Sequence, residues 1–337
     1  MSRIVDIGVD LGTANVIISA KNGGVVLNEP AVIAINRETH NVLRTGAEAG
    51  RMVGRTPSSI VALRPLRDGV ISDFELVSSM LRSMIEKVDK KQLFGGPHVV
   101  LTVPAGVNAM ERHSLIAGLY DAGVRRTHLI EKPLAAALGA GVSIGEAYGR
   151  MIVDIGGGMT DIAVTSLGRI VIRNAPPVGG DAMDDAIIRY IRRKHNLLIG
   201  EVTAAELKHN IASAVPRTDP ISMEVVGRNL ITGLPRAMHI DSDELCEAIE
   251  DPVQQLVENI LSVLENTPAE LAADINEEGI MLTGGGAKLT GLSEKITAAL
   301  KVKCTVADDP QECASRGCAM VLENPRDNSR YLSGKRK

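Results

Sequence analysis

Two aspartates, each followed by a glycine-rich turn, are the residues with the most evident chemistry. Asp10 precedes LGTAN and Asp154 precedes IGGGMT, and a glycine stands two positions after each aspartate. Glycine lets backbone N–H groups approach phosphate oxygens without a Cβ in between. A carboxylate beside such a turn suits Mg²⁺, which keeps most of its waters and contacts few protein carboxylates. The pattern predicts a phosphate-binding site with Asp10 and Asp154 beside the metal.

A third glycine-rich turn, TGGGAKL at 283–289, lies between the β-type run IMLT and a helix-type segment. A helix N-terminus favours anions, or a closely packed base and ribose. Each turn alone is a weak signal, but the three together favour a nucleotide. The chain has neither the GK[ST] of a Walker A loop nor the spacing GxGxxG, so both of those sites are excluded.

The elements that must hold these turns form an internal repeat. Residues 4–20 and 150–166 each contain two β-rich runs joined by one of the Asp-containing turns, which predicts two related domains facing each other. Apolar residues at helical spacing over 73–88 and 109–122 flank a buried-type strand at 97–103. This alternation predicts an α/β fold, with mixed sheets flanked by helices and a cleft between the domains.

The second half of the chain adds helices expected at 184–194 and 245–264, with short β-type runs between them. We expect a first domain at 1–145, with an insertion subdomain at about 31–75. A second domain is expected at 146–323, with an insertion at about 182–244. The remaining residues, 324–337, form a basic polar tail that is expected to be frayed.

Composition limits the class of protein. The chain has 337 residues, 45% of them hydrophobic, which suits two domains. A net charge of −4 argues against a nucleic-acid partner. No apolar run reaches the roughly 18 residues of a membrane span, and the N-terminus lacks a signal peptide, so a cytoplasmic protein is expected. The four cysteines lack the spacing of a zinc site.

The three turns resemble the phosphate 1, phosphate 2 and adenosine motifs of the superfamily of actin, sugar kinases and heat-shock chaperones. Within that superfamily the chain is most similar to the MreB/Mbl family of bacterial actin-like proteins, over roughly residues 4–323. The stretches that carry this resemblance are DLGTANV (10–16), VLNEPAVIAI (26–35), GRTPSSIVALRPLRDGVISDF (54–74), PLAAALGAG (133–141), VDIGGG (153–158), VGGD (178–181), LLIGE (197–201), TGLPR (232–236) and MLTGGGAKL (281–289).

The resemblance implies an actin-like fold of four subdomains around a cleft for ATP with Mg²⁺. It implies assembly into filaments, as a homopolymer or as a copolymer with a paralogue. It also implies a scaffold role with cell-wall elongation proteins at the inner face of the cell membrane, where the protein maintains rod shape. The nucleotide-binding residues implied by position are Gly12, Thr13, Ala14, Asn15, Gly156, Gly157, Gly158 and Thr160 at the phosphates, Gly180, Asp181, Glu206 and Lys208 near the nucleotide or its ribose, and Gly284, Gly285 and Gly286 at the adenosine.

The chain departs from the family at the positions that orient the attacking water. Lys132 stands where the family usually has a glutamate, and Met159 stands where it usually has a threonine. The neighbouring Glu131 belongs to an extended segment, in which adjacent side chains point to opposite faces. A thioether cannot donate a hydrogen bond to water or phosphate. Ala205 likewise replaces a glutamate that faces the ribose, with Glu206 one residue away.

These departures predict a degenerate water-positioning site made of Lys132, Met159 and Asp161. Removing a positioned base typically costs about 10²–10⁴ in rate, so we expect ATP to be bound and hydrolysed slowly or not at all. The alternative is that both substitutions are tolerated in a slow but working ATPase.

A membrane contact is expected at Leu93 and Phe94, which follow Lys90 and Lys91 in a glycine-flanked segment. This segment resembles the membrane-insertion loop of the family. Lysines near an anionic surface contribute about 1 kcal/mol each. The alternative is an ordinary loop with Phe94 packed into the core.

Two other functions share the superfamily. A small-molecule kinase would need a carboxylate that serves a bound hydroxyl, and Lys132 argues against it, as do the NEPAV and RPLRDGVI stretches. A chaperone nucleotide-binding domain would need a substrate-binding module after it. We therefore favour the filament protein over the phosphotransferase.

Overall fold

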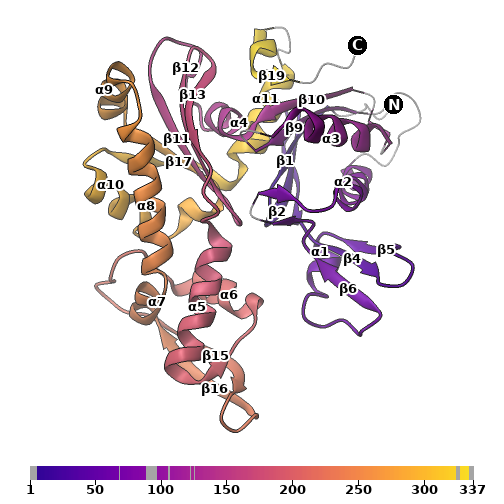
Figure 1. Cartoon of the computed structure of the whole chain (residues 1–337), viewed down its shortest axis with the longest axis vertical. Helices are drawn as coiled ribbons and strands as arrows, with labels where there is room; N and C mark the ends of the chain where they lie inside the picture. The colour runs from indigo at the N-terminus through magenta and orange to yellow at the C-terminus, as the bar shows by residue number, and fades with distance from the viewer. Residues whose placement is uncertain are drawn as a thin grey trace.

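Two central β-sheets form the two halves of the molecule (Figure 1). The computed structural model describes residues 6–67, 69–88, 97–104, 107–121, 123–124, 126–323 and 327–333. The first sheet has the order β19-β10-β9-β1-β2-β3 and the second has the order β13-β12-β11-β17-β18. Their strands are β1 (Ile7–Leu11), β2 (Asn15–Ala20), β3 (Gly24–Pro30), β9 (His98–Val103), β10 (Arg126–Glu131), β19 (Leu332–Ser333), β11 (Arg150–Ile155), β12 (Thr160–Ser166), β13 (Arg169–Asn174), β17 (Ile280–Thr283) and β18 (Cys304–Val306).

The two sheets share one topology. In the first, β1 pairs antiparallel with β2 and parallel with β9, and β2 and β9 in turn pair with β3 and β10. In the second, β11 pairs antiparallel with β12 and parallel with β17, and the flanking pairs β12–β13 and β17–β18 follow the same pattern. The internal repeat predicted from the two Asp-containing hairpins is thereby confirmed, and so is the α/β class with mixed sheets.

Helices cover both faces of the first sheet. On one face, α2 (Phe74–Val88) and α3 (Ala109–Asp121) share a core with the strands, and α2 buries the apolar stripe that its sequence period predicts. The other face packs against α4 (Lys132–Gly139) and α11 (Cys313–Glu323). That second core also contains Ile152 of β11, so α4 and α11 lie between the two halves (Figure 1).

The second sheet packs against helices in one large core. These helices are α5 (Gly180–His195), α6 (Glu201–Ile211), α7 (Ser242–Ala248), α8 (Glu250–Glu265), α9 (Ala269–Glu278) and α10 (Leu292–Leu300), with the short 3₁₀ turns η1 (Gly285–Lys288) and η2 (Pro310–Glu312). The helix expected at 245–264 is in fact two helices, separated at Ile249. Pro252 in the first turn of α8 explains the break, because proline is tolerated at a helix start and not inside a helix.

Smaller sheets occupy the segments predicted as insertions. β4 (Ile33–Asn36), β5 (Val42–Thr45) and β6 (Ile60–Leu63) form one sheet beside α1 (Ala47–Gly50), followed by the hairpin of β7 (Leu66–Arg67) and β8 (Val70–Ile71). β14 (Leu197–Leu198), β15 (Ser222–Asn229) and β16 (Pro235–Asp241) form the other. The domain limits themselves remain predictions, and α11 packs on β1 and α4 of the first half although it lies within the predicted second domain.

The expectation of a frayed tail is wrong for residues 327–333. They form the turn η3 (Asp327–Tyr331) and then β19, which pairs antiparallel with β10 through Leu332 and Ile130. Tyr331 is buried in the core of α4 and α11, and this aromatic ring gives the polar segment its anchor. Among the described residues, no helix is long and apolar enough to cross a membrane.

Candidate functional site

A cavity of about 540 Å³ lies where the glycine-rich turns of the two halves meet. The β1–β2 turn and the β11–β12 turn supply its facing walls, and the turn after β17 supplies a third wall. The predicted site residues that line it are Asp10, Gly12, Thr13, Ala14, Asn15, Lys132, Asp154, Gly156, Gly157, Met159, Asp161, Gly180, Asp181, Lys208, Gly284, Gly285 and Gly286. The structure thus gathers residues from distant parts of the sequence around one cavity.

The two hairpin turns are built alike and touch each other. Gly12 N–H donates to the carbonyl of Asn15 at 3.1 Å, and Gly156 N–H donates to the carbonyl of Met159 at 2.9 Å. A Cβ on Gly157 would lie 2.7 Å from the Cβ of Ala14, so only glycine allows this approach of the two halves. The close contact leaves little space at the turns except the cavity itself.

Asp10 and Asp154 are both buried, and each carboxylate is held by a threonine. Thr102 donates its hydroxyl to Oδ1 of Asp10 at 2.8 Å, and Thr283 donates to Oδ1 of Asp154 at 3.3 Å. The second oxygens face Lys132, whose Nζ lies 3.0 Å from Oδ2 of Asp154 and 3.8 Å from Oδ2 of Asp10. One lysine from within the chain thus forms ion pairs with both predicted metal ligands.

The electrostatics follow from this geometry. Burial alone would lower the pKa of Lys132, but the charges of Asp10, Asp154 and Asp161 outweigh it and hold that pKa above its ordinary value. Burial raises the pKa of Asp10, while the charge of Lys132 opposes the shift. The lysine therefore stays protonated throughout the neutral range.

Asp10 and Asp154 as arranged do not fit a resident Mg²⁺ between them. Each uses one oxygen for a threonine hydroxyl and turns the other toward the ammonium of Lys132. A divalent ion bound directly to both would have to displace that ammonium. Within the described ranges, no group of three His, Cys, Asp or Glu side chains is placed to hold a metal ion.

Helix α4 fixes Lys132 in the cavity and turns its neighbour away. The helix begins at Lys132 with Pro133 in its first turn, and Glu131 precedes it in extended conformation. Glu131 Oε1 is bound by Arg112 at 3.1 Å and lies 3.7 Å from Arg173, outside the lining of the cavity. The prediction that Glu131 and Lys132 face different ways is thus confirmed, and Glu131 does not replace a water-positioning carboxylate.

Met159 contacts the opposite half through the β7–β8 hairpin. A Cβ on Gly69 would lie 1.7 Å from the sulfur of Met159, and Gly69 has a φ of +72° that favours glycine. The N–H of Gly69 donates to the hydroxyl of Thr13 at 3.3 Å. The thioether therefore fills space at the cavity wall against a backbone turn, where a shorter polar side chain would leave room for water.

Three predicted nucleotide-binding residues do not line the cavity. Thr160 is fully buried, with its hydroxyl donated to Val178 and its N–H to Pro176, because it is the first residue of β12 and its side chain turns inward. Gly158 is buried within the β11–β12 turn and is absent from the lining. Glu206 is exposed on α6, and Ala205 lines the cavity in its place. Leu93 and Phe94 lie outside the described residues.

Arg64 and Asp184 line the cavity without a role predicted from the sequence, and each pairs with a residue that has one. Arg64 and Asp181 form an ion pair from opposite halves, and Asp184 accepts a hydrogen bond from Lys208 at 2.8 Å. Lys208 also donates to the carbonyl of Gly180 at 2.7 Å. Arg64 lies within the 54–74 stretch that carries the family resemblance, and this stretch was the one sequence feature that could have indicated a role for it.

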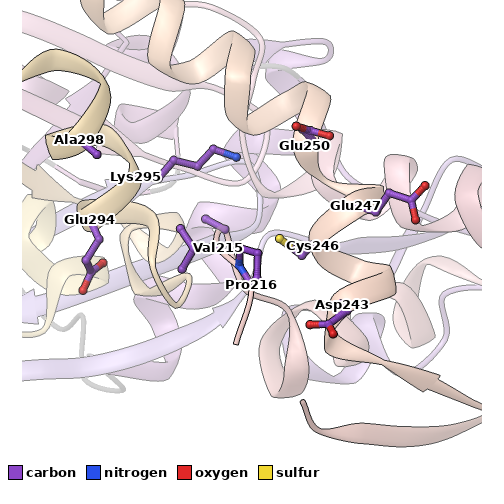
Figure 2. A pocket seen from close by; sticks show the side chains of 10 residues that line it. Val215, Pro216, Asp243, Cys246, Glu247, Glu250, Glu294, Lys295 and Ala298 are labelled. Carbon is purple, nitrogen blue, oxygen red and sulfur yellow. The ribbon is translucent and has the colours of Figure 1, made fainter. Parts of the chain in front are cut away.

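A second hollow, of about 730 Å³, opens between α7, α8 and α10 (Figure 2). Carboxylates dominate its rim, and burial raises the pKa of the Cys246 thiol, so that thiol is not activated. None of the predicted site residues belongs to it. Its lining is Ala214, Val215, Pro216, Asp243, Cys246, Glu247, Glu250, Glu294, Lys295 and Ala298. The second hollow thus lacks the paired glycine turns that face each other in the cleft cavity, which remains the candidate site.

Two halves of one topology, with a cavity at their paired hairpin turns, define the actin-like fold. The chain belongs to the MreB/Mbl family, because the family's sequence model, described as MreB/Mbl protein, matches residues 4–330. It is 44% identical over 319 residues to the cell shape-determining protein Mbl of Bacillus subtilis, covering 95% of this chain and 96% of that protein. It is 43% identical over 323 residues to the cell shape-determining protein MreB of Escherichia coli K12, covering 94% and 93%.

Solved structures agree with this assignment. MreB5 of Spiroplasma citri bound to ADP superposes with a TM-score of 0.91 at 34% identity, over 96% of this chain and 98% of that one. The same protein bound to AMPPNP also gives 0.91 at 34% identity, over 98% and 99%. The MamK double helical filament, at 22% identity and a TM-score of 0.78 over 95% and 99%, shows the same fold.

Proposed function

We propose that this protein binds ATP in the cleft cavity and assembles into filaments that act in cell-shape determination. The observation that carries the proposal is the pair of equivalent glycine turns, one from each half, that face each other around a single cavity. A phosphate chain bound there would contact both halves, so nucleotide binding would be coupled to the relative position of the two halves. The triphosphate end is assigned to the two hairpin turns, and the adenosine end to Gly284, Gly285 and Gly286.

Nucleotide binding is supported by the relatives. MreB5 of Spiroplasma citri is described in complexes with ADP and with AMPPNP, and its fold matches this chain along nearly its whole length. Mg²⁺ as companion of the nucleotide stays a prediction from the sequence, and it would compete with Lys132 for Asp10 and Asp154.

Slow or absent hydrolysis is the second part of the proposal. Lys132 and Met159 line the cavity at the predicted water-positioning centre, and neither side chain accepts a proton from water at neutral pH. Glu131 is held outside the cavity by two arginines. Asp161 also lines the cavity, where it pairs in register with Asp154 on the neighbouring strand. We do not propose that Asp161 replaces the missing glutamate.

Filament formation and a role in cell shape follow from family membership. The similar Mbl and MreB proteins are called cell shape-determining, and MamK of the same fold is described as a double helical filament. We propose a scaffold for cell-wall elongation at the cytoplasmic face of the membrane, with Leu93 and Phe94 in contact with lipid. Whether the filament contains one protein or also a paralogue is decided by co-pelleting.

Three measurements on purified protein test the proposal. Isothermal titration with ATP should show stoichiometric binding, and ATP should increase the polymer pelleted by ultracentrifugation. Phosphate release under the same conditions should be lower than that of a relative with glutamate and threonine at the positions of Lys132 and Met159. No ATP binding would refute the nucleotide-binding part of the proposal. ATP binding with no polymer at any concentration would refute the filament part.

Membrane contact is tested separately by flotation with anionic liposomes. Leu93→Ser with Phe94→Ser should reduce the protein that floats, while Leu167→Ser, a change at an exposed leucine of the second half, should not. Equal flotation of the double variant and the unchanged protein would exclude these two side chains as the membrane contact.

A further inference from the structure

The ammonium of Lys132 stands between the two carboxylates that the sequence predicts as metal ligands, with Nζ 3.0 Å from Asp154 and 3.8 Å from Asp10. We infer that Lys132 supplies, from within the chain, the positive charge that a divalent cation would otherwise supply here. The cleft then binds the triphosphate of a nucleotide without a metal ion. This inference rests on the proposed nucleotide-binding function.

The ammonium also faces the predicted phosphate turn. Lys132 lines the cavity, and a Cβ on Gly156 would lie 3.8 Å from its Nζ. An ammonium has three N–H donors, and lysine binds phosphate as a point charge. It therefore contacts carboxylates on one side and lines the cavity, where phosphate oxygens would bind, on the other.

Burial makes this charge effective. The side chain of Lys132 is 14% exposed, and those of Asp10 and Asp154 are 8% and 2% exposed. Charges in such surroundings are screened far less than those in water. Without Lys132, the carboxylates of Asp10, Asp154 and Asp161 would together repel a triphosphate from the cavity.

The ion pairs with Asp10 and Asp154 hold the ammonium against the dipole of its own helix. Lys132 is the first residue of α4, and a cation at a helix N-terminus is opposed by the helix dipole. The remainder of α4 is fixed by apolar packing against α11. The lysine is therefore held in place by its ion pairs with Asp10 and Asp154.

Charge inversion provides the sharpest variant. Lys132→Glu changes the local charge from +1 to −1, a difference of two units, which is the charge of one Mg²⁺. The variant should therefore depend on a metal ion where the unchanged protein does not. Lys132→Met removes the charge at similar length and should fall between the two.

The experiment compares ATP affinity in excess EDTA and in excess Mg²⁺ by isothermal titration. For the unchanged protein, the two dissociation constants should agree within about threefold, whereas Lys132→Glu should lose about a hundredfold or more in EDTA. Lys295→Glu makes the same inversion in the second hollow and serves as the matched control, expected to behave like the unchanged protein. Loss of binding by the unchanged protein in EDTA, as steep as that of Lys132→Glu, would overturn the inference.

A second measurement uses the unchanged protein alone and needs neither a nucleotide nor a variant. Mn²⁺ added to the nucleotide-free protein should show no bound ion by electron paramagnetic resonance, because the ammonium holds the site; stoichiometric Mn²⁺ bound at the cleft would overturn the inference. ATP binding that requires a metal ion would refute this inference alone. No ATP binding in either buffer would refute the proposed function, and this inference with it.

Discussion

Arg64 and Asp181 form an ion pair across the cleft, with Nη1 of the arginine 3.2 Å from Oδ1 of the aspartate. Arg64 follows β6 in the first half, and Asp181 is the second residue of α5 in the second half. Both line the cavity, and both side chains are more than one-third exposed. The pair is thus a direct polar connection between the halves at the wall of the cavity.

Breaking this pair should weaken the connection only modestly, because exposed ion pairs contribute about 0.2–1 kcal/mol. A double-mutant cycle with Arg64→Ala and Asp181→Asn, measured by urea unfolding, should give a coupling free energy in that range. The coupling should fall in about 1 M salt, where the screening length is only about 3 Å. Arg44→Ala, at an exposed pair with Glu48 within the first half, is the control and should show no coupling to Asp181→Asn. Zero coupling between Arg64 and Asp181 at low salt would show that the pair does not connect the two halves.

Stability should depend on pH through Asp184. Burial raises the pKa of Asp184 to about 6, in spite of the neighbouring charge of Lys208. An acid with a raised folded-state pKa binds more protons folded than unfolded, so its contribution is favourable below about pH 4 and is lost as the pH rises to about 6.

Asp184→Asn should remove this dependence. Relative to the unchanged protein, the variant should gain roughly 1–3 kcal/mol of unfolding free energy between about pH 4 and pH 7. Urea unfolding of both proteins at matched pH values measures the difference, and the other titrating groups cancel in it. If the difference in unfolding free energy between the two proteins stayed constant over this interval, the pKa of Asp184 would not be raised in the folded protein.

The contact between α4 and α11 should not tolerate added volume. A Cβ on Gly317 of α11 would lie 1.9 Å from the carbonyl oxygen of Ala135 in α4. Gly317→Ala should therefore cost about 1–3 kcal/mol, as overpacking does in cores. Gly200→Ala, where a Cβ would meet nothing within 4 Å, should cost less than about 1 kcal/mol as a change at a helix cap. Thermal unfolding of the two variants compares them, and equal melting points would refute the close contact.

Restoring a carboxylate and a hydroxyl should restore hydrolysis. Lys132→Glu with Met159→Thr should raise phosphate release by about 10²–10⁴ in the presence of Mg²⁺, the usual contribution of a positioned base. Lys132→Met with Met159→Leu removes the same side chains without adding a base, and should give no gain. Unchanged turnover in the first double variant would mean that the two native residues are tolerated in an ordinary slow ATPase.

The repeat, the mixed sheets and the cleft could be predicted because glycine turns and apolar periods are local signals. The hairpins carry Asp10 and Asp154 at equivalent positions, and the topology of the two sheets follows from that repetition. The ion pairs of Lys132 could not be predicted, because they depend on where the first turn of α4 meets two strands of different halves. That Thr160 does not line the cavity could not be predicted for a related reason, since only the register of β12 shows that its side chain turns inward.

The packing of α11 on the first half has a consequence for how the chain is made. The core that contains Val100, Ile130 and Leu134 is completed by Cys318 and Leu322. Synthesis proceeds from the N-terminus, so the core of the first half is completed only after α11 has left the ribosome. Until then the part of this core that α11 covers remains exposed apolar surface, which favours aggregation. A nascent chain that stops before α11 should therefore be prone to aggregation, even though it contains both phosphate turns.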